Sequence, residues 1–453
     1  MPTLEIAEVE TAEDRPAPPR LHLISRVALI VFCLFSLYIS ARQTFWYLSH
    51  GPIFADFRIF MTGVDLVKSG HAHELYHFSA QQVAQENLYP ETRRSGMLPF
   101  NHLAFELLFY WPFSYLSYQN AVVAWALVNL VLVFVIGWLL RPYTRSITRV
   151  TGVPVALYLL ASYPVVYALG EGQDSLIFLL LLVLSLRSMD AGLAFLAGAL
   201  LALGCFKLHL ALLVGFFALV LARKWKASAG FAAGGALATG ASLAIVGPSL
   251  FSDYVLMVRT QEVMTPWGFF PFFMPNLRGF FRWTLRSYLE PGQIVPVVFM
   301  ASVIVGIVAA WLVVRRRAPR DSSLLYSVSI VTTILISYHL HMQDLSIITL
   351  PILVIVDWAL RNQNTSSRLS SWWVAALALS VGSLYFYRPA AEPFPILLFR
   401  SCYLAAPVFL FWMVAFSAFC RNRCTTSQPA QQVVNPSQVV PSMPKGRSAS
   451  AAF

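Results

Sequence analysis

Residues 121–140 read AVVAWALVNLVLVFVIGWLL, an apolar run without a charged side chain. An α-helix of this length rises about 30 Å, which is the thickness of the hydrocarbon core of a membrane. The same character extends over the whole chain, where 58% of the residues are hydrophobic and 12% are charged. Because about a quarter of the residues in a soluble domain are charged, this composition predicts a polytopic membrane protein with an all-α fold.

Further runs of this kind lie on both sides of residues 121–140. Counting those long enough to cross the hydrocarbon core, we expect about 12 transmembrane helices. The predicted spans are 24–41, 121–140, 153–169, 174–187, 191–204, 206–222, 228–246, 293–314, 322–338, 345–360, 371–387 and 396–419. The first of them is interpreted as an uncleaved anchor, because it lacks a convincing small-residue cleavage site.

The rest of the sequence divides into tails and loops. Residues 1–23 are acidic and then proline-rich, and residues 421–453 are rich in Ser, Pro and Gln. Both compositions predict a cytoplasmic tail, the second one disordered. The transmembrane domain therefore covers 24–420. Its long hydrophilic segments, 42–120 and 247–292, are predicted to be loops on the outer face.

The basic residues orient the chain. There are 32 lysines and arginines against 21 acidic residues, a net charge of +11. Most of the basic residues lie in the two tails and in short loops between spans, as Arg141, Arg145 and Arg149 do. Because short cytoplasmic loops carry the excess of Lys and Arg, both termini are predicted to lie in the cytoplasm. The protein is predicted to lie in the cell membrane. In a soluble protein such a net charge would suggest a nucleic-acid partner. Here the membrane topology explains most of it, so no nucleic-acid partner is expected.

Residues 98–117, LPFNHLAFELLFYWPFSYLS, are rich in aromatic residues and contain Pro99 and Pro112. If they formed a full span, the later basic clusters would face outward, against the rule just applied. We therefore expect an interfacial or re-entrant helix within the first outer loop. The alternative is a genuine span and a topology with one more helix.

Polar and ionisable residues gather at the predicted outer ends of the spans. Since charges near hydrocarbon are costly unless they are paired, hydrated or functional, we expect them to converge on one site at the outer face. The candidates are Asp56 in the first loop, Gln173 and Asp174, Lys207 at the tip of a short helical hairpin, Arg278 and Arg282 in the second loop, and His339 and His341. Basic groups in such a site suit an anionic lipid, whose phosphate they would neutralise.

Several stretches together resemble a known family. They are ADFRIF (55–60), SGHAHELY (69–76), AVVAWALVNL (121–130), GEGQDSLIFLLLL (170–182), AGLAFLAGALLALGCFKLH (191–209) and YHLHMQDLSIITLP (338–351). In order and spacing they resemble the family-87 glycosyltransferases, over roughly residues 50–360. The chain differs from the family at Leu98 to Phe100, where the family has Tyr-Pro-Pro, and at Leu208, where the family has proline.

The resemblance implies an integral membrane enzyme of the C superfamily, like the mannosyltransferases of phosphatidylinositol mannoside synthesis. Such an enzyme would transfer a hexose from a polyprenyl-phosphate-linked donor to a lipid-linked or cell-envelope acceptor, among membrane lipids. Asp56 would be the general base, and direct attack would invert the anomeric carbon. No cofactor is expected, and a metal is not required because the donor carries no nucleotide. The donor phosphate is assigned to Lys207, Arg278 and Arg282, and the sugar or acceptor to Gln173, Asp174, His339 and His341.

Other interpretations of these residues stay open on the sequence alone. Asp56 is placed to pair with Arg58, Lys207 to extend its ammonium to the interface, and Asp174 to cap the following span. The pair His339 and His341 with Asp344 resembles a metal site, and the histidines of HAHELYH resemble a hydrated loop surface. For the whole protein, the main alternative is a secondary transporter of a lipid-linked or anionic solute, and a third is a non-catalytic scaffold.

Overall fold

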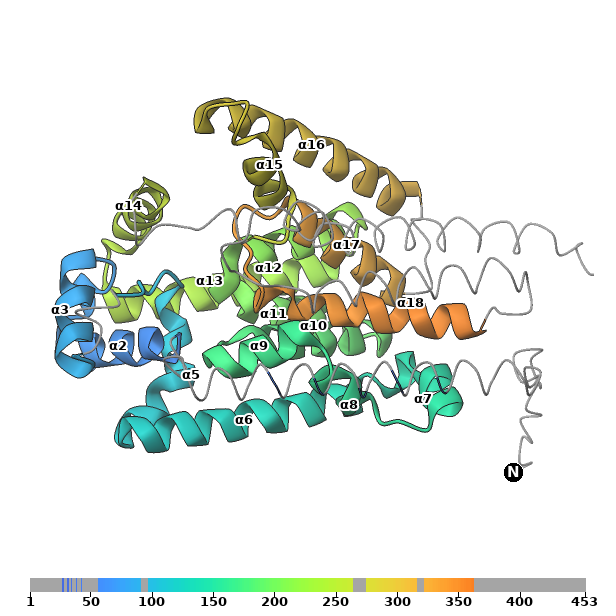
Figure 1. The fold of residues 1–453 in the computed structure, drawn as a ribbon, viewed down its shortest axis with the longest axis horizontal. Helices are drawn as coiled ribbons and strands as arrows, with labels where there is room; N and C mark the ends of the chain where they lie inside the picture. The colour runs from blue at the N-terminus through green and yellow to red at the C-terminus, as the bar shows by residue number, and fades with distance from the viewer. Residues whose placement is uncertain are drawn as a thin grey trace, which may run out of the picture.

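The computed structural model describes residues 56–90, 97–263, 274–315 and 322–361, with five isolated positions between 27 and 42. Most of these residues are helical and none of them forms a strand, so the all-α prediction is confirmed for the described part of the chain (Figure 1). The predicted spans at 24–41, 371–387 and 396–419 and the two tails, 1–23 and 421–453, lie outside the continuous described ranges.

Four helical stretches among the described residues are long and apolar enough to cross a membrane. They are Tyr118–Leu139, which is α6, Ala194–Leu221, Trp225–Val246, which is α13, and Pro291–Val314 within α16 (Pro291–Arg315). Their outward side chains include Phe134, Phe299 and Ile307, each more than half exposed. Rows of large apolar side chains on a surface are stable against lipid tails and costly against water, so these helices fit a membrane protein.

The second of these stretches reaches that length only as a whole, because it contains a reversal of the chain. It consists of α11 (Ala194–Ala202), the 3₁₀ turn η6 (Leu203–Lys207), α12 (Leu208–Gly215) and the π-helical turn η7 (Phe216–Leu221). Gly198 before the turn and Gly215 after it both lie against Phe231 of α13, which is possible only if the chain turns back between them. Lys207 stands at the turn, where its ψ of 67° leaves the helical range. The hairpin with Lys207 at its tip therefore lies where the sequence predicted it.

The predicted span at 153–169 is not one continuous helix. The chain forms two short helices there, α8 (Val155–Leu160) and α9 (Tyr163–Glu171), separated at Ala161 and Ser162. Pro164 near the start of α9 explains the break, because proline lacks the N–H that a continuing helix would use.

The other predicted spans within the described ranges correspond to helices that fall short of, or just reach, a full crossing. These are α10 (Ser175–Asp190), α17 (Ser322–Ile336) and the pair η9 (Asp344–Ile348) and α18 (Thr349–Arg361). The count of twelve spans therefore stays a prediction.

A separate layer of short helices lies at one end of the bundle, on the left in Figure 1. We call it the loop layer; it comprises α2 (Phe57–Lys68), η2 (Ala72–Glu74), α3 (Phe78–Leu88), η3 (Ala104–Glu106), α5 (Leu107–Tyr110) and η4 (Trp111–Tyr115). The three turns after residue 103 are too short to cross about 30 Å of hydrocarbon, so residues 98–117 contain no helix of spanning length. The loop layer has its own core, in which Phe57 and Tyr110 pack against Trp125 of α6 and Phe60 stacks on Tyr110.

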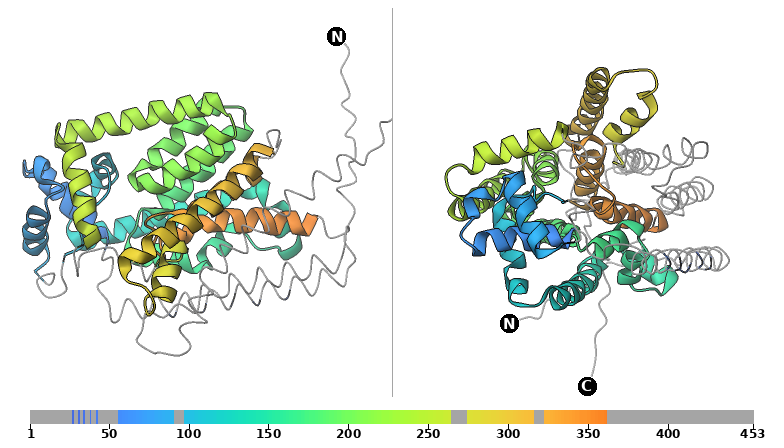
Figure 2. Two further views of the ribbon diagram at one scale, coloured as in Figure 1. Left: turned by 90° about the horizontal axis from the view of Figure 1, so that it is seen from above. Right: turned by 60° about the vertical axis from the view of Figure 1, so that its left-hand side comes forward.

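The remaining helices complete the two ends of the bundle. On the side of the loop layer lie α14 (Leu250–Val263), which crosses the end of α13 in Figure 2, and α15 (Leu277–Leu285). At the other end η5 (Arg141–Tyr143) leads into α7 (Arg145–Thr151). The Asp357 carboxylate of α18 accepts hydrogen bonds from the Ser146 and Ile147 amides at 2.6 and 3.2 Å, and this cap fixes α7 to the bundle.

Candidate active site

Asp56 stands immediately before α2, where the loop layer meets the bundle. Its amide donates to the Glu171 carbonyl at 3.2 Å, and its carboxylate accepts a hydrogen bond from the Gln173 side chain. Burial raises the pKa of Asp56 to about 6, although the Gln173 hydrogen bond and Lys207 oppose that shift and Asp174 adds to it. A carboxylate with such a pKa is charged at neutral pH and basic enough to accept a proton.

The turn that carries Gln173 is fixed by its neighbours. Gly172 adopts a left-handed conformation with φ of 69°, which ends α9 and which glycine adopts without steric cost. The indole of Trp125 donates to the Gly172 carbonyl at 2.8 Å, and the Trp125 ring stacks on Phe57 at the start of α2. Asp56 and Gln173, 117 residues apart in sequence, are therefore held by the same aromatic contact.

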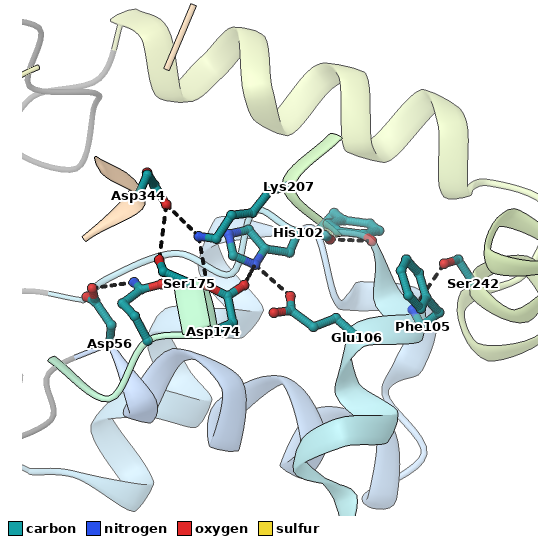
Figure 3. Close-up of polar contacts among 11 residues, drawn as sticks. Asp56, His102, Phe105, Glu106, Asp174, Ser175, Lys207, Ser242 and Asp344 are labelled. Carbon is teal, nitrogen blue, oxygen red and sulfur yellow. Dashed lines mark hydrogen bonds and ion pairs between the residues drawn. The ribbon is translucent and has the colours of Figure 1, made fainter. Parts of the chain in front are cut away.

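Lys207 lies between two carboxylates in the interior. Its ammonium is 2.7 Å from Asp174 Oδ1 and 2.6 Å from Asp344 Oδ1, and the three side chains are at most 4% exposed (Figure 3). Asp344 also accepts from the Ser175 hydroxyl at 3.3 Å and from the His341 amide at 3.0 Å. Lys207 does not extend to an interface, and the Asp174 side chain does not cap α10; both of these interpretations are wrong.

His102 extends this network on the other side of Asp174. Its Nδ1 lies 2.6 Å from Glu106 Oε2 and 3.3 Å from Asp174 Oδ2. Burial by itself would lower the pKa of His102, but the two carboxylates outweigh it and raise the pKa to about 10. The ring is therefore an imidazolium at neutral pH, and Asp174 sits between two cations, His102 and Lys207. Sequence reasoning did not single out His102 or Glu106.

A second group of nitrogen-bearing side chains lies near Asp344, which pairs with Lys207 and accepts a hydrogen bond from the His341 amide. Asn276 caps α15 by accepting from the Gly279 amide at 3.0 Å and donates to the Ser337 carbonyl at 2.8 Å. The cap fixes α15 to the segment that carries His339 and His341. On this helix Arg278, which is 6% exposed, donates to the Tyr338 carbonyl at 2.9 Å and stacks over the Tyr338 ring.

The histidines of this group meet edge to face. The His339 ring contacts the His209 and His341 rings, with centroids 5.6 and 4.5 Å apart. Burial lowers the pKa of His341, and the charges of Lys207 and Arg278 lower it further against the opposing effect of Asp344. His341 is therefore a neutral imidazole within electrostatic range of Lys207, Asp344 and Arg278.

The structure brings most of the predicted site residues into one neighbourhood and leaves others outside it. Arg282 lies one turn beyond Arg278 on α15 and is half-buried, with no described contact to the cluster. His71 and His73 are 57% and 66% exposed beside Glu74. The interpretation of the HAHELYH histidines as a hydrated surface is therefore confirmed for these two.

Within the described residues, one group has ligand atoms close enough to hold a metal ion: His102, Glu106 and Asp174, within 4.8 Å of one another. The Lys207 ammonium already lies 2.7 Å from Asp174. A metal ion between the same carboxylates would meet that positive charge across a short distance in a buried site, where like charges repel strongly. We therefore interpret the group as a hydrogen-bonded ion network.

The site consists of buried ionisable side chains, and it lies where the loop layer meets a bundle of apolar helices. This arrangement is typical of a membrane protein whose functional site lies at one end of its helical bundle. The sequence model of glycosyltransferase family 87 matches residues 104–337, about half of the chain. The chain therefore belongs to glycosyltransferase family 87, and it is a membrane glycosyltransferase. The matched region includes Gln173, Asp174, Lys207 and Arg278, whereas Asp56 lies before it. No curated protein and no solved structure matches the chain.

Proposed function

We propose that this glycosyltransferase moves a hexose, with mannose as the first candidate, from a polyprenyl-phosphate-linked donor to a lipid-linked or cell-envelope acceptor. The transfer takes place at the outer face of the cell membrane. The observation that carries the proposal is the Asp56 carboxylate, raised in pKa by burial and held by Gln173 beside a network of buried charges. This is the arrangement that a general base for a hydroxyl nucleophile needs.

In the proposed reaction the acceptor hydroxyl attacks the anomeric carbon of the donor sugar. The bond between that carbon and the phosphate oxygen breaks, and the electron pair leaves with polyprenyl phosphate. The hydroxyl proton passes to Asp56, which later releases it to water. Attack opposite the leaving phosphate inverts the anomeric carbon, because a single displacement exchanges the two faces.

The donor phosphate is best assigned to the group around Arg278. Lys207 faces two carboxylates at 2.7 and 2.6 Å, so its charge is balanced before a phosphate arrives. Arg278 and the neutral His341 lie within electrostatic range of one another and supply N–H donors. A guanidinium matches the oxygens of a phosphate with two parallel hydrogen bonds.

Gln173 is the candidate for the sugar. Its amide nitrogen donates to Asp56, while its carbonyl oxygen is buried and has no hydrogen-bond partner among the described residues. A buried acceptor without a partner is costly unless a ligand supplies the donor. A sugar hydroxyl is such a donor, and binding it there would hold the ring next to the base.

The class of donor can be tested directly with purified protein in proteoliposomes and an extract of membrane lipids as acceptor. Radiolabelled polyprenyl-phosphate-mannose is expected to give labelled product, whereas the matching nucleotide sugar is expected to give none. Transfer from the nucleotide sugar alone would overturn the proposed donor class. Transfer from a different polyprenyl-phosphate hexose would retain the class and correct the sugar.

The pH dependence of transfer is expected to follow Asp56. Only the carboxylate form accepts a proton, and burial raises the pKa of Asp56 to about 6. The ratio kcat/KM should therefore be constant above this pH and fall about tenfold for each pH unit below it. The measurement is a set of initial rates from about pH 4.5 to 8. A profile that rises as the pH falls through 6 would show that the protonated form is the active one.

Replacing Arg278 with glutamine is expected to raise the KM for the donor by about tenfold to a hundredfold, since a hydrogen bond to a charged group contributes about 1.5–3 kcal/mol. The value of kcat should change less. Arg286 at the end of α15, which is exposed and stacks on Trp283, provides the control Arg286→Gln. An unchanged KM in Arg278→Gln would remove Arg278 from the phosphate site.

A further inference from the structure

The segment that leads to His102 is buried although it has no regular secondary structure. Residues 97–101 form no helix, and Met97 and Phe100 are 3% and 1% exposed. Buried backbone N–H and C=O groups need hydrogen-bond partners. In helices and sheets the backbone supplies them, so this segment must find them elsewhere.

Two glutamines of α3 supply these partners. The Leu98 amide donates to Gln85 Oε1 at 2.9 Å, and Gln85 Nε2 donates back to the Leu98 carbonyl at 3.1 Å. The Phe100 amide donates to Gln81 Oε1 at 2.6 Å, and Gln81 Nε2 donates to the Phe100 carbonyl at 3.3 Å. Each side-chain amide thus pairs with one residue as a neighbouring β-strand would. We call this arrangement the glutamine clamp.

The clamp is anchored at both ends. Gln81 Nε2 also donates to the Leu75 carbonyl at 2.7 Å, which joins the clamp to the end of η2. One residue later the Tyr76 hydroxyl donates to the His102 carbonyl at 2.9 Å. Contacts from the loop layer therefore fix the backbone of His102 independently of the contacts that its side chain makes.

The His102 ring connects the fixed backbone of this segment to the network of buried charges. Its Nδ1 reaches Glu106 and Asp174 at 2.6 and 3.3 Å, and Asp174 in turn holds Lys207 at 2.7 Å. Asp174 directly follows Gln173, the partner of Asp56. A displacement of His102 would thus shift Asp174 and the turn on which the base depends.

We propose that His102, held in place by the glutamine clamp, is a positioning residue that fixes Asp174 and through it the Gln173–Asp56 pair. His102 touches neither sugar nor acceptor in this account. The kinetic part of the proposal rests on the proposed function. The structural part, the coupling of residues 97–102 to the turn at 172–174, does not.

The side-chain test compares His102→Asn with His102→Phe. The asparagine amide nitrogen takes the place of Nδ1 and keeps a donor for Asp174, whereas phenylalanine keeps the ring and loses the donor. His102→Phe is expected to lower kcat by about tenfold to a hundredfold, the usual effect of a small misplacement in an active site. His102→Asn should recover most of this loss. Equal losses in both variants would overturn the role of the Nδ1 donor.

The clamp test uses the double substitution Gln81→Met and Gln85→Met. Gln82 on the exposed side of α3 provides the matched control Gln82→Met. If the clamp acts through His102, its loss should lower kcat in the unmodified chain and have little further effect in His102→Phe. Additive losses would mean that clamp and histidine act independently, which overturns the proposal.

Hydrogen exchange of the purified variants gives a readout that needs no transfer. Peptides covering 97–103 should exchange faster when the clamp is removed, and peptides covering 172–178 should exchange faster in both the clamp variant and His102→Phe, but not in His102→Asn. Unchanged exchange at 172–178 would overturn the coupling even if the enzyme is active. If the unmodified chain transfers no sugar while these exchange changes appear, the proposed function fails and the positioning role stands.

Discussion

Replacing Asp56 with asparagine is expected to lower kcat for sugar transfer by about 10²- to 10⁴-fold, the range for losing a positioned general base. Asparagine has nearly the same shape and retains an oxygen for the hydrogen bond from Gln173, but it cannot take up the proton of the acceptor hydroxyl. The variant should therefore fold and bind the donor as the unmodified chain does. Initial rates of transfer in proteoliposomes measure the effect.

The control for this substitution lies on α2, the helix that Asp56 precedes. Asp65 stands in α2 and is half-buried, so Asp65→Asn removes a similar charge from the adjoining helix. This control should transfer sugar at nearly the unmodified rate. If Asp56→Asn also retains that rate, Asp56 is not the base, and the proton acceptor must be sought elsewhere in the site.

The second large effect is expected at Lys207. Replacing it with methionine keeps most of its length but leaves Asp174 and Asp344 buried without the ammonium that both face at 2.7 and 2.6 Å. Removing one partner of a buried ion pair costs about 3–5 kcal/mol, because the remaining charge is uncompensated. Lys207→Met should therefore unfold at a markedly lower temperature in detergent micelles.

Two comparisons separate this effect from a general loss of packing. Lys226→Met removes an exposed lysine near the start of α13 and should leave the unfolding temperature unchanged. Adding Asp344→Asn to Lys207→Met removes one uncompensated charge and should recover part of the lost stability. If the double variant is less stable than Lys207→Met, electrostatic pairing is not the main role of this lysine.

The long apolar helices could be predicted from sequence because hydropathy and length determine them. Helices α6 and α13 begin and end within a few residues of the predicted spans at 121–140 and 228–246. The same reasoning overlooked the break between α8 and α9, where local hydropathy stays high on both sides. Pro164 was the available signal, since proline disfavours a continuing helix.

The sequence identified which residues belong to the site better than it identified their burial and their ion pairs. Asp56, Gln173, Asp174 and Lys207 were chosen as polar and ionisable groups near the outer ends of the predicted spans, yet Asp174 and Lys207 are buried and paired. Hydropathy treats each residue separately and does not reveal that Lys207 meets a carboxylate 137 positions away in sequence.

The loop-layer contribution was missed for a related reason. His102 and Glu106 lie within an aromatic stretch that was judged only for whether it spans the membrane. Their spacing of four residues was a usable signal, because such a pair lies on one side of a helical turn. The glutamine clamp could not have been found this way, since Gln81 and Gln85 pair with backbone groups whose position depends on the fold.

The anomeric configuration of the product distinguishes a single displacement, in which Asp56 deprotonates the attacking hydroxyl, from a double one. Purified protein would be supplied with ¹³C-labelled polyprenyl-phosphate-mannose of known configuration, and the anomeric C–H coupling of the product would be measured by NMR. An inverted configuration is expected, because Asp56 acts as a base in a single displacement. Retention would contradict it, because two displacements would then be required and a carboxylate such as Asp56 would have to act as a nucleophile instead of a base.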